Sequence, residues 1–239
     1  MIPITLLIPA YNPQPVLLDL INQAINQKIK HIVVINDGSI NPQSLSLFDS
    51  LRTDSRIVVL DHPHNIGKGA ALKTGFKYIA LYLADCVGVV TADADGQHVI
   101  DDILKVGQTL IKDPNNLVLG VRAFDNGVPF RSKIGNVVTR WVFKKITGLT
   151  ITDTQTGLRG IGLINKPIYL EIPSNRYEFE LDMLLISNSN GIKITEVPTK
   201  TIYLNNNKSS HFSPFFDSMR IYSVFLKFMV YRARYIIKS

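Results

Sequence analysis

Short apolar runs alternate with longer amphipathic segments through the first half of the chain. Five runs rich in β-branched residues predict strands, at residues 4–8, 31–36, 56–61, 87–92 and 117–121. Between them, apolar residues recur at helical spacing near residues 15–27, 42–52, 68–83 and 100–112. This alternation predicts an α/β fold in which helices cover both faces of a mostly parallel sheet.

Polar residues follow the predicted strands at the point where each one ends. Asn12 follows the first strand and Asp37 the second, while His62 follows the third and Asp93 the fourth. Ligands of an open α/β sheet bind outside the carboxyl ends of its strands. We therefore expect these four strand ends to converge on one crevice.

The strand–helix alternation stops after Arg122. The later patterns predict helices at residues 130–147, 177–189 and 215–237. They also predict a polar loop at residues 153–159 and a strand at residues 192–203. The helix at 215–237 is apolar but interrupted by cations, so it is too charged to span a bilayer. This pattern is typical of an amphipathic helix at a membrane interface, and the alternative is a helix packed on the domain.

The composition favours a globular protein with an anionic partner. The 239 residues include 46% hydrophobic ones and carry a net charge of +7, with a pI near 9.4. No RNA-binding aromatic pattern or helix-turn-helix is evident, so we expect no nucleic-acid partner. The single cysteine, Cys86, excludes an intrachain disulfide. With no signal peptide and no uncharged apolar run of 18 residues, we expect a cytoplasmic chain without a transmembrane helix.

Two carboxylates stand two residues apart after the fourth predicted strand. Asp93 and Asp95 are followed by Gly96 and Gln97. Hard divalent cations prefer oxygen ligands and are often shared with substrate phosphates. The sequence therefore predicts Mg²⁺ or Mn²⁺ held by Asp93, Asp95 and the Gln97 amide beside a diphosphate. The alternative is a simple loop of turn-forming residues.

A lysine between two glycines marks the start of the third predicted helix. Gly67, Lys68 and Gly69 would place free N–H groups and the positive end of the helix dipole where a phosphate could bind. Asp37 would accept an N–H of uracil or guanine, and Tyr11 offers an aromatic face. The alternatives are an ordinary loop–helix junction, a simple turn and a packed tyrosine.

Four motifs, taken in their order along the chain, resemble those of glycosyltransferase family 2. They are Ile-Pro-Ala-Tyr-Asn, Asn-Asp-Gly-Ser, Asn-x-Gly-Lys-Gly-Ala-Ala-Leu and Asp-Ala-Asp-Gly-Gln-His, at residues 8–12, 36–39, 65–72 and 93–98. Later segments, such as Asp-Thr-Gln-Thr-Gly-Leu-Arg at 153–159, resemble the branch that glycosylates dolichyl or polyprenyl phosphate. The resemblance implies a GT-A fold and a metal-dependent, inverting transfer of a hexose from a UDP- or GDP-linked donor.

The resemblance also implies roles for individual residues. Those that would bind the nucleotide sugar are Pro9, Ala10, Tyr11, Asn12, Asp37, Lys68, Asp93 and Ala94. Those that would hold the acceptor phosphate are Arg122, Arg131 and Ser132, and Arg159 offers a further forked cation. Those expected to be catalytic are Asp95, Asp153 and Arg131. His211, in a later loop, is a candidate lid over the diphosphate and the metal.

The chemistry of the acceptor decides whether a general base is needed. A phosphate monoester is already mostly dianionic at neutral pH, because its second pKa is near ~6. It needs arginines to position it rather than a base. A hydroxyl of a glycan, lipid or protein is the alternative acceptor, and it would need Asp153 or Glu180 as base. A non-enzymatic basic module that binds nucleotides or nucleic acid is the third interpretation.

These expectations divide the chain into functional parts. Residues 1–122 would be the nucleotide-sugar-binding half, residues 123–212 the acceptor-binding half of the same GT-A domain, and residues 213–239 the amphipathic C-terminal helix. Such a protein would lie peripherally on the cytoplasmic face of a membrane, where it meets a polyprenyl-phosphate lipid and an anionic surface. A membrane-embedded partner and a homo-oligomer both stay open.

Overall fold

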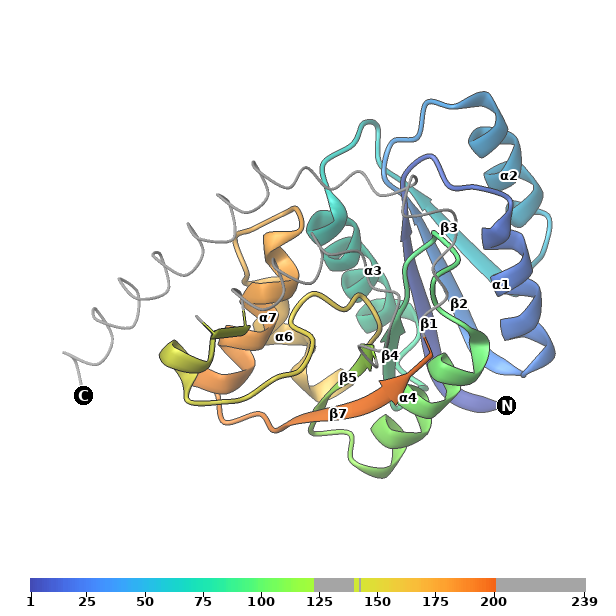
Figure 1. Ribbon diagram of the computed structural model, residues 1–239. Coiled ribbons are helices and arrows are strands. Elements are labelled where there is room, and N and C mark those ends of the chain that lie inside the picture. Colours follow the sequence, from blue (N-terminus) through green and yellow to red (C-terminus); the bar gives the residue numbers. More distant parts are fainter. Residues whose placement is uncertain (123–139, 142, 201–239) are drawn as a thin grey trace.

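A computed structural model describes residues 1–122, 140–141 and 143–200 of the chain. Figure 1 shows a single twisted sheet with helices on both sides. Its strands are β1 (Ile2–Ala10), β2 (Ile29–Asn36), β3 (Ile57–Asp61), β4 (Gly88–Thr91), β5 (Leu117–Arg122), β6 (Arg159–Gly162) and β7 (Ile194–Thr199). Its helices are α1 (Val16–Asn26), α2 (Pro42–Arg52), α3 (Lys68–Tyr82), α4 (Ile100–Lys112), α6 (Lys166–Leu170) and α7 (Glu178–Ser189), with a 3₁₀ turn, η1, at Leu163–Asn165.

The sheet has the order β3-β2-β1-β4-β6-β5-β7. Neighbouring strands from β3 to β4 pair in parallel, and so do β5 and β7, whereas β6 runs antiparallel to both β4 and β5. The prediction of a mostly parallel α/β sheet is confirmed, as are the five strands and four helices of the first half. The helix expected at 177–189 and the strand expected within 192–203 are also present.

Two apolar cores lie on the two faces of the sheet. On one face, alternate residues of β1 and β2, such as Leu7 and Val33, pack with α3, α6 and α7. On the other face, the intervening residues, such as Leu6 and Val34, pack with α1, α2 and α4. The period of two along each strand thus divides its apolar side chains between both cores, which is why these strands appear in the sequence as nearly continuous apolar runs.

Strand β6 was not predicted. It has only four residues, two of them glycine, and it begins at Arg159, the last residue of the expected polar loop. Gly162 is needed for its tight packing, because a Cβ there would collide with the carbonyl oxygen of Pro114. A four-residue strand with Ile161 as its one β-branched residue is too short to show a period-two pattern, so the hydrophobic pattern cannot reveal it.

Several expectations fall on residues outside the described part. They are the amphipathic helix at 215–237, the lid residue His211, and the acceptor residues Arg131 and Ser132. Of the helix expected at 130–147, the described residues 140, 141 and 143–147 are helical. Among all described residues, none of the helices has the length and hydropathy to cross a bilayer.

Candidate active site

The central feature of the site is an ammonium group between two carboxylates. Lys68 is the first residue of α3, and its Nζ lies 2.6 Å from Oδ1 of Asp93 and 2.9 Å from Oε1 of Glu180. Asp93 follows β4, and Glu180 lies in the first turn of α7. The carboxyl end of the sheet and two helix starts therefore meet at one cluster, as expected for an open α/β sheet.

The charged groups of this cluster shift one another's pKa values. Removal from water would lower the pKa of Lys68, but Asp93 and Glu180 outweigh it and raise that pKa above its ordinary value. Burial would likewise raise the pKa of Asp93, but Lys68 and His98 bring it well below its usual range. Burial and then repulsion from Asp93 raise the pKa of Asp95. At neutral pH, Asp93 is therefore an anion paired with the Lys68 ammonium.

Residues 153–159 pass directly beside this cluster. Thr91 at the end of β4 donates its hydroxyl to the Gly157 carbonyl over 2.7 Å. A Cβ on Gly157 would collide with the carboxylate of Asp93, so only glycine fits beside that carboxylate. Residues 153–159 therefore lie against Asp93 at the end of β4.

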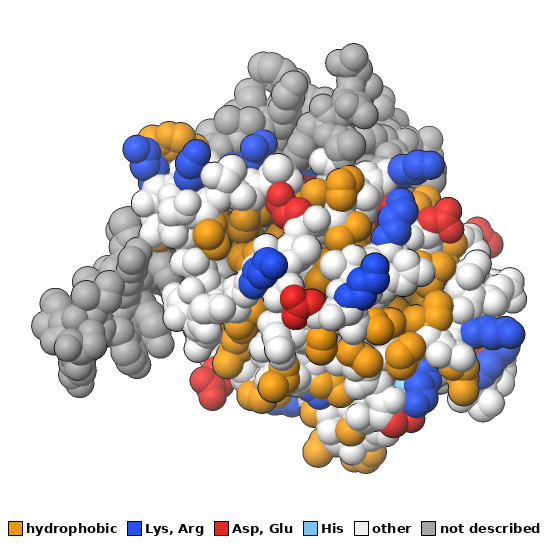
Figure 2. Space-filling model, turned by 90° about the horizontal axis from the view of Figure 1, so that it is seen from below, with side chains coloured by type: hydrophobic (Ala, Val, Ile, Leu, Met, Phe, Trp, Pro, Cys, Tyr) orange, Lys and Arg blue, Asp and Glu red, His pale blue; other side chains and the backbone are white. Residues whose placement is uncertain are grey.

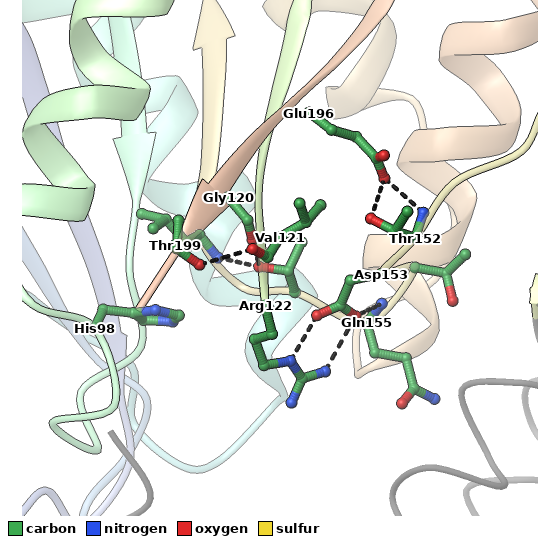
Figure 3. Close-up of polar contacts among 12 residues, drawn as sticks. His98, Gly120, Val121, Arg122, Thr152, Asp153, Gln155, Glu196 and Thr199 are labelled. Carbon is green, nitrogen blue, oxygen red and sulfur yellow. Dashed lines mark hydrogen bonds and ion pairs between the residues drawn. The ribbon is translucent and has the colours of Figure 1, made fainter. Parts of the chain in front are cut away.

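Arg122 at the end of β5 forms a forked ion pair with Asp153. The Nε–Oδ2 distance is 2.6 Å and the Nη2–Oδ1 distance is 3.0 Å. Dashed lines mark both contacts in Figure 3. Asp153 is fully buried, and its Oδ1 also accepts the N–H of Gln155. The ion pair therefore holds the Arg122 guanidinium and the loop that carries Asp153 in fixed positions.

The wall around this pair is held by β5 and β7. The Thr199 hydroxyl donates to the carbonyl of Val121 over 3.0 Å, and the Thr156 hydroxyl donates to that of Gly120 over 2.6 Å. Glu196 accepts both the N–H and the hydroxyl of Thr152 (Figure 3). These bonds fix the loop that carries Asp153 and hence the direction of the Arg122 fork.

Arg159 lies elsewhere than the sequence suggested. Its side chain is 1% exposed, and its guanidinium donates to the carbonyls of Thr156, Glu180 and Thr154. Burial lowers its pKa, although Glu180 and Asp153 act in the opposite direction. A guanidinium committed to three backbone carbonyls braces the loop against α7. We therefore leave Arg159 out of the acceptor site proposed below.

The glycines at the start of α3 have a packing role. A Cβ on Gly67 or Gly69 would collide with the backbone of Asn175, and the Ala70 N–H donates to the carbonyl of that same residue. The segment before α7 thus caps this helix start, which we had expected to offer free N–H groups to a phosphate. Its cationic contribution to the site is the Lys68 side chain.

The residues expected to border the nucleoside lie at the ends of β1 and β2. The side-chain oxygen of Asn12 accepts the N–H groups of Ile40 and Asn41, while the Asn12 N–H donates to the hydroxyl of Ser39. Pro9 and Ala10 are buried, and Tyr11 is half-buried. The two strand ends are therefore tied into one wall, with Asp37 at its centre.

The side-chain oxygens of Asp93 and Asp95 are the candidate ligands of a divalent metal ion. Among the described residues, no group of three or more His, Cys, Asp and Glu side chains is arranged to hold a metal ion. Asp93 and Asp95 nevertheless bring two like-charged oxygen donors together. Mg²⁺ is commonly bound by one or two carboxylates together with substrate phosphates. The donor set therefore fits such an ion in company with a diphosphate.

Sequence reasoning missed two contributors to this cluster. His98 lies with its Nε2 3.4 Å from Oδ2 of Asp93, and Gly157 abuts the same carboxylate. The position of His98 five residues after Asp93 was a usable signal, because both residues belong to one short turn before α4. The approach of Gly157 depends on β6, which the hydrophobic pattern did not reveal.

Comparison with known proteins places these features in a family. Residues 5–163 match the model described as Glycosyl transferase family 2. The chain is 33% identical over 219 residues to the UDP-N-acetylglucosamine–dolichyl-phosphate N-acetylglucosaminyltransferase of Methanococcus voltae, covering 84% of this chain and 86% of that protein. It is 31% identical over 205 residues to an uncharacterised protein of Methanocaldococcus jannaschii, covering 84% and 82% respectively.

A more distant relative and a solved structure agree with this pattern. A dolichyl-phosphate beta-glucosyltransferase of Trichomonas vaginalis is 29% identical over 216 residues, which cover 82% of this chain and 65% of that protein. Glucosyl-3-phosphoglycerate synthase from Mycobacterium tuberculosis, in complex with Mn²⁺, UDP and glucosyl-3-phosphoglycerate, superposes with a TM-score of 0.69. That match has 16% identity and covers 94% of this chain and 79% of the synthase. The structural likeness confirms the predicted GT-A fold.

Proposed function

The chain belongs to glycosyl transferase family 2, and from this premise we propose that it transfers a hexose, with inversion, from a UDP- or GDP-linked donor to a polyprenyl or dolichyl phosphate. The observation that carries the proposal is the cluster of Lys68 between Asp93 and Glu180, with the Arg122–Asp153 pair at the end of β5. The names of the M. voltae and T. vaginalis relatives support the lipid phosphate as acceptor.

The donor half of the proposed site would bind a nucleoside diphosphate. Asp93, Asp95 and Gln97 would hold Mg²⁺ or Mn²⁺, which would neutralise charge on the diphosphate and stabilise it as a leaving group. Lys68 lies next to Asp93, so its ammonium adds a fixed positive charge on the same side. The Mn²⁺ and UDP named with the M. tuberculosis synthase agree with such a donor site.

The acceptor half needs a cation more than a base. Both carboxylates considered as a base are already in ion pairs, Asp153 with Arg122 and Glu180 with Lys68. In each pair, at least one carboxylate oxygen faces a cation and not an acceptor hydroxyl. A phosphate dianion needs no deprotonation, so the pairing favours it over a hydroxyl. Arg122 would hold that phosphate, together with Arg131 and Ser132 from the part of the chain that is not described.

A direct assay would test the proposal. The purified protein, supplied with Mn²⁺ and a short polyprenyl phosphate, should consume members of a panel of UDP- and GDP-sugars. The expected products are a nucleoside diphosphate and a glycosylated lipid with inverted anomeric configuration. Consumption of no donor, or a product that retains the donor's configuration, would contradict the proposal.

Replacing Asp153 with asparagine should leave most of the catalytic step intact. If Asp153 only orients Arg122, Asp153→Asn should lower kcat by less than about tenfold, whereas loss of a general base costs about 10²–10⁴-fold. Stopped assays with saturating donor and lipid phosphate would measure kcat. Because breaking a buried ion pair is destabilising, thermal melting and donor binding must first confirm that the variant is folded. A loss of 10²-fold or more in a folded variant would favour the hydroxyl-acceptor alternative.

The proposed membrane contact includes a described helix beyond the site. Trp141 is 62% exposed, and Nζ of Lys145 lies 5.9 Å from the centre of its ring, with Lys144 exposed beside it. A tryptophan among lysines is typical of a helix at an anionic bilayer surface.

The face of the molecule seen in Figure 2 has Lys and Arg side chains scattered among acidic and apolar ones. It is therefore unlike a continuous basic surface for nucleic acid.

Replacing Trp141 should therefore weaken binding to lipid. Each basic residue near an anionic surface contributes about 1 kcal/mol, and the indole adds apolar area. We expect Trp141→Ala to lower the partition coefficient on phosphatidylserine vesicles by about fivefold or more, measured by flotation. Tyr82→Ala is the matched control, because Tyr82 is an equally exposed aromatic on α3. Equal flotation of both variants and the unmodified chain would rule out a role of Trp141 in membrane binding.

A further inference from the structure

A buried hydrogen-bonded relay connects Asp37 to α3. Nδ1 of His62 lies 2.7 Å from Oδ1 of Asp37, and Nε2 of the same ring lies 2.9 Å from the hydroxyl oxygen of Thr74. The side chains of His62 and Asp37 are only 8% and 4% exposed. Three elements of the donor half thus meet in one chain of polar contacts: the end of β2, the segment after β3, and the second turn of α3.

The chemistry of the partners fixes the direction of the relay. A carboxylate only accepts hydrogen bonds, so Nδ1 of His62 donates to Asp37. In the neutral ring Nε2 is then an acceptor, and it takes the hydroxyl proton of Thr74. Asp37 therefore sets the ring tautomer, and Thr74 gives the other ring nitrogen a partner that holds the ring in place.

The remaining contacts of Asp37 determine which of its lone pairs stay open. Oδ1 accepts from His62 and from the Ile66 N–H over 3.1 Å, while Oδ2 accepts from the Gly67 N–H over 2.9 Å. Each carboxylate oxygen accepts about two hydrogen bonds. Among the described residues, two donors thus fill Oδ1, and Oδ2 retains one position. An N–H donor that approaches Asp37 meets a single acceptor of fixed direction.

We propose that His62 and Thr74 are positioning residues of the donor site, which hold Asp37 so that Oδ2 accepts one N–H from the nucleobase. The inference deepens the proposed function and rests on it. Uracil has one N–H donor on its pairing edge, so it matches a single open acceptor. Guanine offers an adjacent N–H and NH₂, which are best met by both oxygens of a carboxylate. The relay thus selects a uracil nucleotide as the donor.

A pair of nucleotides isolates this contact. UDP carries the N3–H, and 3-methyl-UDP carries a methyl group in its place, with the rest of the nucleotide unchanged. Calorimetry with Mn²⁺ should give the full chain a preference for UDP of about 10- to 100-fold, the usual range for a hydrogen bond to a charged group. His62→Phe and Thr74→Val should each reduce this preference at least about threefold. Thr74→Ser should keep the preference for UDP at the level of the unmodified chain, because serine keeps the hydroxyl.

The matched control is His64→Phe, the same change at an exposed histidine two residues away. It should leave the preference unchanged. Thermal melting separates loss of the relay from loss of the fold, and Thr74→Val is nearly isosteric should His62→Phe not fold. Equal binding of both nucleotides to the unmodified chain would overturn the proposal, and so would variants that keep the full preference. If the chain transferred sugar but bound both nucleotides equally, only the relay would fail; if it bound neither, the proposed function would fail first.

Discussion

Lys68→Met should remove most of the transferase activity while leaving a folded protein. The ammonium lies within 3 Å of carboxylate oxygens of both Asp93 and Glu180, where a neutral side chain would leave two anions facing the phosphates of the donor. A fixed charge at such a position contributes about 10²–10³-fold to the rate. We therefore expect kcat/KM for the nucleotide sugar to fall by about that factor.

The control for this change lies on the same helix. Lys77→Met alters an exposed lysine of α3 and should leave kcat/KM within about twofold of the unmodified chain. Steady-state kinetics with varied donor would measure both variants after their melting temperatures are compared. Activity of a folded Lys68→Met variant within tenfold of the unmodified chain would mean that this ammonium does not face the donor.

Removal of the divalent ion should have the second large effect. We expect EDTA to weaken the binding of UDP- or GDP-sugar by at least about tenfold, because a metal shared with the diphosphate contributes several kcal/mol. Asp95→Ala should remove most of the gain that Mn²⁺ provides, since repulsion between Asp95 and Asp93 is relieved by a cation. Calorimetry with and without Mn²⁺ would measure the gain.

Asp101→Ala serves as the matched control, because Asp101 is an exposed aspartate six residues further along the chain. Its variant should keep the full gain from Mn²⁺. Equal donor affinity of the unmodified chain in EDTA and in Mn²⁺ would contradict the metal hypothesis, whatever the variants do.

The parts of the fold that were predictable carry strong local signals. Runs of β-branched residues located β1 to β5, and helical spacing located α1 to α4, because those elements bury continuous apolar faces. Strand β6 carries no such signal, since two of its four residues are glycines that serve close packing. Sequence patterns describe burial along one element, and β6 is defined by its two neighbours.

The candidate site was predictable to the same extent. The turn with Asp93 and Asp95 was recognised because its residues are adjacent in the sequence. The contact between Lys68 and Glu180 joins positions more than a hundred residues apart, so only the packing of α7 on α3 reveals it. Arg159 was assigned to the acceptor phosphate because a guanidinium can bind phosphate as a fork, whereas here it donates to three backbone carbonyls.

The relay around Asp37 has the same origin. Asp37 and His62 both follow predicted strands, but the sequence does not reveal that they share a hydrogen bond or that Thr74 completes it. Side chains of three elements meet because β2 and β3 pair in parallel and α3 packs across them. A turn of the Asp-Gly-Ser type thereby becomes a rigid acceptor at the strand end.

The identity of the acceptor tests the account most directly. The purified chain, with Mn²⁺ and its preferred nucleotide sugar, should be offered a polyprenyl phosphate and the corresponding free polyprenol at equal concentration. We predict a glycosylated product from the phosphate and none from the alcohol, because the carboxylates that would act as a base are held in ion pairs by Arg122 and Lys68. Transfer to the alcohol at a comparable rate would contradict the account.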